Sequence, residues 1–324
     1  MKAVVWAEYG PPDVLQLKEV ARPTPKDDDV LVGVRATSVN WADLASVRGR
    51  PFLVRLTGGG LRRPKNTILG ADLAGWVEAV GRNVRQFRPG DEVFGDVGDH
   101  GLGAFAQYVC VPENALALKP NNVDFEEAAA APLAASVALQ GLRDSGRIQP
   151  GQRVLIIGAS GGIGTFALQI AKSFGAEVTG VCSTRNLDLV RSIGADWALD
   201  YTKEDFARKE QHYDVILDIV ANRSVSDYMR ALRPTGIYVA CAFSAVALFV
   251  GPVISAISSK KVTSLIHKTS AEDLVFVKEL LEAGKVVPVI DKRYPLSEVA
   301  EAIRHYGEGH PQGKVVVAVE HGGR

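Results

Sequence analysis

The residues best placed to do chemistry are the glycines of one short turn, Gly158-Ala159-Ser160-Gly161-Gly162-Ile163-Gly164. An apolar run, Val154 to Ile157, precedes the turn, and a helical pattern from Thr165 to Phe174 follows it. Glycines in this order let a backbone leave a buried strand, come close to a pyrophosphate and offer the N–H groups of a helix N-terminus to the anion. The pattern therefore predicts a dinucleotide-binding turn.

The strand after this helix, Glu177 to Cys182, ends in Ser183-Thr184-Arg185. A site for NAD usually places an acid about 20 residues after the first glycine, where it holds the ribose hydroxyls, whereas a 2′-phosphate needs hydroxyls and a cation. No acid directly follows this strand, so the sequence favours NADPH. The alternative is that Ser183 or Thr184 only caps the next helix.

The composition bounds the class of protein. A length of 324 residues favours two domains. The 37 basic and 37 acidic residues balance, which argues against a nucleic-acid partner or an anionic membrane surface. The three cysteines are far apart, as expected of reduced thiols in a cytoplasmic protein that binds no metal. An uncharged stretch, Ala240 to Ser259, is interrupted by Gly251-Pro252, so we expect a buried strand and an interface helix there and no integral membrane span.

The pattern of expected elements divides the chain into three regions. Short strands with Pro and Gly turns over 1–122 predict a barrel-like β domain. Strands alternate with helices over 123–270, which predicts a doubly wound parallel sheet and an α/β class overall. Residues 271–324 fit poorly as a continuation of that sheet, so we assign them to the first domain, which becomes discontinuous. The insertion 50–66 has no clean period, and it is either a lid or a plain surface loop.

The sequence pattern also gives bounds for three individual elements. We expect one helix from Phe125 to Leu142, continuing past Pro132. We also expect a strand from Val286 to Ile290 and a helix from Pro295 to Tyr306.

Sequence blocks in a fixed order carry a family resemblance over nearly the whole chain. They are Val30-Leu31-Val32 with Ser38-Val39-Asn40-x-x-Asp43, Leu69 to Gly81, Phe87 to Gly95, the glycine turn, Gly194-Ala195-Asp196 with Asp200-Tyr201, and Gly313 to Val316. The chain resembles the medium-chain dehydrogenase/reductase superfamily and, within it, the zinc-free quinone oxidoreductase branch of zeta-crystallin-like and reticulon-4-interacting-protein-like reductases.

The resemblance implies a GroES-like β-barrel catalytic domain and a Rossmann domain, with NADPH bound in the cleft between them. It implies that Asn40 and Asp43 are catalytic and lie beside the nicotinamide and the substrate. The cofactor-binding residues that it implies are Ser136, Val137, Ser160, Gly161, Gly162, Ile163, Ser183, Thr184, Arg185, Tyr201, Val220, Ala242, Phe243 and Lys314.

Some of these residues have purely structural alternatives, and some depart from the family pattern. In the structural alternative, Asp43 only caps a helix, Tyr201 only packs against its neighbours, and Lys314 is a solvated charge at the edge of a sheet. Val137 stands where many relatives have Thr, which removes one hydroxyl contact to the nicotinamide. Pro51-Phe52 stand where some enoyl reductases carry a proton-donating Tyr, so the sequence assigns no proton donor.

The reaction implied by the resemblance is hydride transfer to a small molecule, a quinone or an α,β-unsaturated carbonyl. Zinc-dependent relatives take metal ligands at the positions of Asn40 and Ala71-Asp72, so no metal is expected here. The Asn40 amide is expected to donate a hydrogen bond to the oxygen on which negative charge develops. An alcohol or carbonyl dehydrogenase and a low-turnover nucleotide-binding scaffold are the alternatives. A homodimer or homotetramer is also implied.

Overall fold

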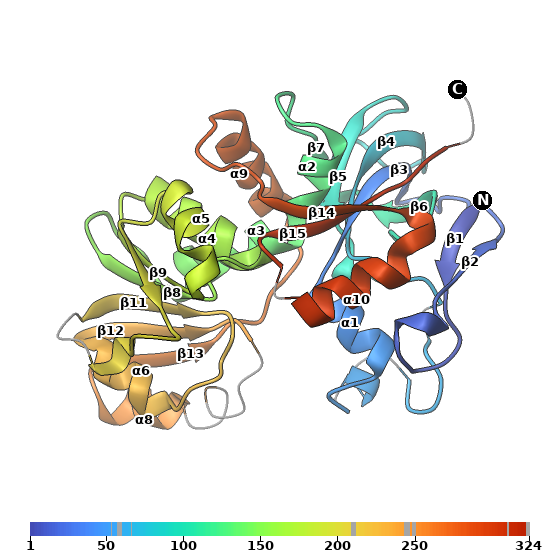
Figure 1. Ribbon diagram of the computed structural model, residues 1–324. Coiled ribbons are helices and arrows are strands. Elements are labelled where there is room, and N and C mark those ends of the chain that lie inside the picture. The colour runs from blue at the N-terminus through green and yellow to red at the C-terminus, as the bar shows by residue number, and fades with distance from the viewer. Residues whose placement is uncertain are drawn as a thin grey trace. The chain divides into compact units, whose positions relative to one another are not determined.

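The computed structural model describes residues 1–52, 54–56, 60–65, 67–208, 212–242, 247, 251–309 and 311–321. Two compact units make up the chain (Figure 1). Unit 1 consists of Met1–Leu133, Lys268–Ala283 and Pro288–Arg324, and unit 2 of Ala134–His267 and Gly284–Val287. The domain boundaries predicted from the sequence lie at 122/123 and 270/271.

Unit 2 contains a six-stranded parallel sheet in the order β10-β9-β8-β11-β12-β13. Its strands are β8 (Arg153–Ile157), β9 (Glu177–Cys182), β10 (Trp197–Asp200), β11 (Tyr213–Asp218), β12 (Leu232–Ala240) and β13 (Lys261–Ser264). Helices cover both faces of the sheet: α4 (Gly162–Ser173) and α5 (Leu187–Ser192) on one, α6 (Val225–Ala231) and α8 (Gly251–Ile257) on the other (Figure 1). The order reverses between β8 and β11, which is where open α/β sheets bind ligands. The predicted α/β class with a doubly wound parallel sheet is confirmed.

Unit 1 is mainly antiparallel. Seven strands form its larger sheet, in the order β14-β15-β3-β4-β5-β7, with β6 also paired to β3. The strands are β3 (Asp29–Val39), β4 (Asp72–Val80), β5 (Glu92–Asp96), β6 (Tyr108–Pro112), β7 (Leu116–Leu118), β14 (Ile290–Pro295) and β15 (Lys314–Ala318), and a separate pair is β1 (Lys2–Val5) with β2 (Gln16–Glu19). The helices are α1 (Trp41–Arg48), α2 (Phe125–Ala130), α9 (Ala271–Glu282) and α10 (Val299–Gly309). The C-terminal segment thus returns to the sheet of the N-terminal segment.

The structure corrects the three expected elements. The helix across Pro132 is broken, because α2 ends at Ala130 and α3 (Pro132–Leu139) begins at the proline, whose missing N–H cannot continue a helical ladder. The strand predicted at Val286–Ile290 is displaced, since β14 begins only at Ile290. The last helix begins at Val299, after a 3₁₀ turn over Leu296–Glu298. In the described part of the chain, no helix combines the length and apolar character needed to cross a membrane.

Strand register in unit 1 explains how residues far apart in sequence reach one place. In β3 and β4, Ser38 pairs with Asp72, and β15 pairs Val315 with Val39. The residue before Val315 is Lys314, and the residue after Val39 is Asn40. Asn40, Asp72 and Lys314 therefore lie at the same end of three adjacent strands.

Candidate active site

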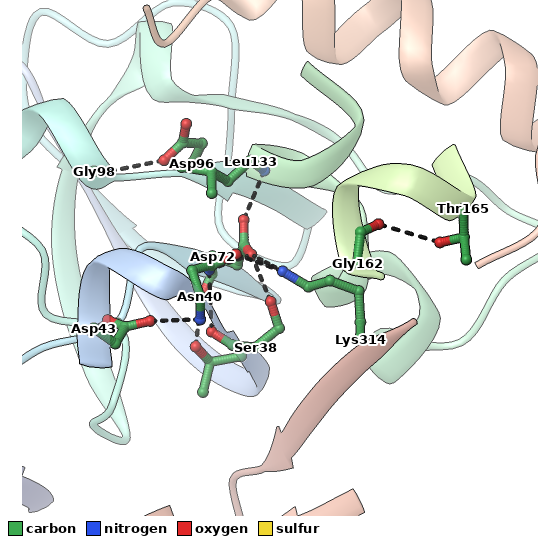
Figure 2. Close-up of polar contacts among 12 residues, drawn as sticks. Ser38, Asn40, Asp43, Asp72, Asp96, Gly98, Leu133, Gly162, Thr165 and Lys314 are labelled. Carbon is green, nitrogen blue, oxygen red and sulfur yellow. Dashed lines mark hydrogen bonds and ion pairs between the residues drawn. The ribbon is translucent and has the colours of Figure 1, made fainter. Parts of the chain in front are cut away.

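Asp72 is the centre of a buried polar cluster in unit 1 (Figure 2). Its Oδ2 accepts hydrogen bonds from Ser38 Oγ (2.5 Å), Asn40 Nδ2 (2.9 Å) and Lys314 Nζ (3.1 Å). Its Oδ1 accepts from the Leu133 backbone N–H at 2.7 Å. Asp72 is 0% and Lys314 2% exposed. A buried ion needs further hydrogen bonds besides its counter-ion, and the Asp72 carboxylate has them on both oxygens.

Lys314 also fixes the orientation of the Asn40 side chain. Lys314 Nζ donates to Asn40 Oδ1 at 2.6 Å, while Asn40 Nδ2 faces the Asp72 carboxylate. An ammonium only donates and an ionised carboxylate only accepts. In the flipped orientation the amide NH₂ would face the ammonium, so that two donors would meet, and the amide oxygen would face the carboxylate, so that two acceptors would meet. The amide orientation is therefore determined by its neighbours.

Asp43 holds the backbone around this cluster. Its Oδ2 accepts the Asn40 N–H (2.8 Å), which forms a capping box at the start of α1, and its Oδ1 accepts the Gly70 N–H (3.1 Å). Burial raises the pKa of Asp43 to about 7, helped by the nearby Asp72 charge, although the two N–H groups and Lys314 act in the opposite direction. The capping function is present, and Asp43 acts on the cluster through the backbone of Asn40.

The glycine turn of unit 2 has the geometry predicted for an anion site. Gly158 has φ +86°, a value that favours glycine, and a Cβ on Gly164 would lie 2.1 Å from the Gly158 carbonyl oxygen. Gly161 is the N-cap of α4 and offers no side chain to the first helical turn. The N–H groups of that turn are consequently left for an anionic ligand. Beside them, Ser160 Oγ accepts from Asn186 Nδ2 at 2.8 Å.

The end of β9 differs from the expectation in one respect. An acid is present there after all: Asp200 ends the neighbouring strand β10 and pairs with Cys182. The Thr184 hydroxyl donates to Asp200 at 2.5 Å, and the Thr202 hydroxyl donates to it at 2.7 Å. The Thr184 bond in particular lowers the pKa of Asp200 to about 2. Since its hydrogen goes to Asp200, the Thr184 hydroxyl presents only lone pairs to other groups.

The remaining predicted residues lie in unit 2, mostly at the carboxyl ends of its strands. Val220 follows β11 and is 47% exposed, and Ala242 follows β12. Ser183, Arg185 and Tyr201 lie at the ends of β9 and β10, where Tyr201 is 51% exposed. Ser136 and Val137 are buried in α3, and Phe243 lies outside the described residues.

Two residues that carry these arrangements, Asp72 and Asp200, were missed as site residues. Asp72 left a signal in the sequence, because it is an acid directly before the apolar run Leu73 to Val77 of a β pattern. Asp200 belongs to one of the sequence blocks of the resemblance, but its position beside Thr184 depends on the pairing of β9 with β10. The described residues include no group of three or more His, Cys, Asp or Glu suited to a metal ion.

Comparison with protein families finds two matching models. Residues 26–121 match the alcohol dehydrogenase GroES-like domain, and residues 193–317 match the zinc-binding dehydrogenase family. The first match covers most of the antiparallel sheet of unit 1 and includes Asn40, Asp43 and Asp72. The second covers the end of unit 2 and continues through Lys314.

Individual relatives are similar over almost the full chain. The 2-methylene-furan-3-one reductase of Solanum lycopersicum is 37% identical, over 98% of this chain and 79% of the relative. The chloroplastic NADPH-dependent alkenal/one oxidoreductase of Arabidopsis thaliana is 35% identical over the same shares. Among solved structures, the quinone oxidoreductase from Coxiella burnetii superposes with a TM-score of 0.89 at 29% identity, covering 99% of both chains.

Proposed function

The chain belongs to the zinc-free quinone oxidoreductase branch of the medium-chain dehydrogenase/reductase superfamily, and we propose that it transfers hydride from NADPH to a quinone or an α,β-unsaturated carbonyl. The predicted family is confirmed. The predicted cofactor and the predicted acceptor classes agree with the names of the relatives. These include an NADPH-dependent alkenal/one oxidoreductase and a quinone oxidoreductase. NADPH supplies the hydride, and the protein supplies binding, orientation and electrostatics.

The observation that carries the proposal is the buried cluster around Asp72. Alcohol oxidation needs a group that stabilises an alkoxide, and zinc serves this purpose in the metal-dependent relatives. Here the corresponding positions hold the Asn40 amide and a carboxylate that already accepts four hydrogen bonds. Releasing Asp72 to a metal would leave the buried Lys314 ammonium without its counter-ion. The cluster suits an acceptor whose oxygen is stabilised by hydrogen bonds.

The glycine turn fits the cofactor. We assign the pyrophosphate to the N–H groups of Gly162 and Ile163, with the Gly161 backbone and the Ser160 hydroxyl beside them, because α4 begins there and Gly161 gives it no capping side chain. The Gly161 N–H itself donates to the Gly158 carbonyl oxygen at 3.1 Å. Ala242 and Val220 follow strands that end at the same edge of the sheet, and we assign them to the ribose and nicotinamide side.

The 2′-phosphate is assigned to the residues after β9 and β10. Arg185 supplies the cation and Ser183 a hydroxyl, and the exposed Tyr201 ring is available to the adenosine. Thr184 also belongs to this group, but with a different role from the one expected from the sequence. Its hydroxyl donates to Asp200 and so holds the loop, and it does not donate to the phosphate.

Two further features of the prediction remain proposals. We propose a homodimer formed along β13, the edge strand of the parallel sheet, because Val253, Ile257 and Ile266 next to it are 57%, 80% and 73% exposed. A homotetramer would need a second surface. We also propose a cytoplasmic location, although the relatives include chloroplastic and mitochondrial proteins.

The test is steady-state oxidation of NADPH by the purified protein with a quinone, a linear enone and a saturated ketone side by side, and with NADH in a parallel series. We expect turnover with the quinone or the enone, little with the ketone, and weaker saturation by NADH. Faster reduction of the ketone, or faster oxidation of simple alcohols by NADP⁺, would show a carbonyl dehydrogenase. NADPH binding without turnover would show a nucleotide-binding scaffold.

A further inference from the structure

The hydrogen bonds of Asn40 change the role expected for it. One amide hydrogen goes to Asp72 Oδ2 at 2.9 Å, and the other points to the Ser38 carbonyl oxygen at 3.4 Å. Both donors of the amide are therefore directed into the protein, and the group left over is a lone pair on Oδ1. Asn40 as it stands can accept a hydrogen bond from a ligand, but it has no hydrogen to offer to a substrate oxygen.

Lys314 has the opposite balance. Its ammonium carries three hydrogens, and the described residues supply two acceptors, Asn40 Oδ1 and Asp72 Oδ2. One hydrogen of a 2% exposed cation therefore has no acceptor within the described part of the chain. A buried donor left in this way is costly unless a ligand accepts from it.

The other buried lysine of unit 1 shows that this is not a general feature of buried lysines. Lys119 is 8% exposed, and its Nζ lies near three acceptors: the carbonyl oxygens of Pro120 (3.0 Å) and Val123 (2.8 Å), and Glu92 Oε2 (3.1 Å). Its three hydrogens are matched by three acceptors, so Lys119 is a structural lysine.

We propose that Lys314 is a catalytic residue, which donates a hydrogen bond and then a proton to the carbonyl oxygen of the substrate, with Asp72 and Asn40 as the positioning residues. The proposal rests on the proposed function, since it assumes a conjugated carbonyl acceptor. Asp72 and Asn40 Oδ1 hold two of the ammonium hydrogens, which fixes the direction of the third.

The step balances for an enone. Hydride adds to the β-carbon, the carbon–carbon π electrons shift toward the carbonyl, and negative charge develops on its oxygen. A hydrogen leaves Lys314 Nζ as a proton and bonds to that oxygen, which gives an enol and a neutral amine. The amine takes a proton from water, and the enol becomes the saturated ketone by proton exchange with water. The sum is one hydride and one proton added across the double bond.

The experiment compares Lys314→Met, Lys314→Ala and the control Lys119→Met in the full chain. NADPH affinity is measured by fluorescence titration, and kcat with an enone is measured at saturating NADPH. We expect kcat to fall about 10²- to 10³-fold for Lys314→Met, as for loss of one oxyanion donor, with NADPH affinity changed less than about threefold. Lys119→Met should keep the kcat of the wild type.

Rescue separates catalysis from a structural role. Lys314→Ala leaves space for a small amine, so added ethylammonium should raise its kcat, whereas Lys314→Met fills that space and should not respond. A kcat within threefold of wild type for both variants overturns the proposal. Weaker NADPH binding with unchanged kcat also overturns it, because Lys314 would then be only a cofactor contact. If Lys314→Met fails to fold, the absence of amine rescue in Lys314→Ala decides against the proposal. A wild-type protein that reduces no conjugated carbonyl or quinone refutes the proposed function instead.

Discussion

Removing the Asp43 carboxylate should change how stability depends on pH. Asp43 is 1% exposed, and burial raises its pKa to about 7. An aspartate in the unfolded chain titrates near 4. Between these values the folded protein holds a proton that the unfolded chain has lost, so the contribution of Asp43 to the free energy of unfolding declines as pH rises from about 4 to about 7.

The magnitude follows from the difference in pKa. A pKa raised from 3.8 to about 7 differs by about 3, and each pKa unit corresponds to about 1.36 kcal/mol. The free energy of unfolding of the wild type should therefore fall by about 4 kcal/mol, relative to a variant without this titration, between pH 4 and pH 8. The sign is opposite to that of an aspartate stabilised by a salt bridge, whose contribution grows with pH.

Urea unfolding of wild type and Asp43→Asn at half-unit steps from pH 4.5 to 8 measures this difference. Asp200→Asn is the matched control, because the pKa of Asp200 is lowered to about 2 and the group is ionised in both states above pH 5. The difference in free energy of unfolding between Asp200→Asn and wild type should not change with pH over the same range. Parallel pH curves for wild type and Asp43→Asn would refute the reasoning and would mean that Asp43 is ionised throughout.

Three further predictions concern unit 2. Arg185→Ala should weaken NADPH binding about 10- to 100-fold, the effect of losing one hydrogen bond to a charged group, and should leave NADH affinity unchanged. Thr184→Val should change NADPH affinity less than about threefold, because the Thr184 hydroxyl donates to Asp200. Isothermal titration with both cofactors measures these affinities. Gly164→Ala should lower the midpoint of thermal unfolding, measured by calorimetry, because its Cβ would lie 2.1 Å from a carbonyl oxygen. Gly161→Ala should fold normally, because the atom nearest to its Cβ is at 3.5 Å, but titration should show that it binds NADPH poorly. Ile257→Glu should shift sedimentation toward the monomer if β13 forms the dimer edge, and an unchanged sedimentation coefficient would exclude that interface.

What the sequence predicts well are features in which local pattern and chemistry coincide. The glycine turn lies between its strand and helix within one continuous segment, and the steric demand at Gly158 and Gly164 can be read from residue type alone. The capping role of Asp43 is equally local, since it spans Asn40 to the third residue of α1. The failed expectation at Pro132 was also local, and the missing N–H of proline was a sufficient reason to end the helix there.

The Asp72 cluster could not be derived from local sequence patterns, because the register of strand pairing brings its residues together. Asn40, Asp72 and Lys314 are separated by 32 and 242 positions in the chain, and only the pairing of β3 with β4 and β15 brings them together. Shifting β15 by one residue would turn Lys314 to the opposite face of the sheet, since side chains alternate along a strand. The sequence identifies Asn40 as a polar residue suited to the reaction, but which atoms of Asn40 are used depends on its two charged neighbours. The assignment of the donor to Lys314 in place of Asn40 thus follows from tertiary structure.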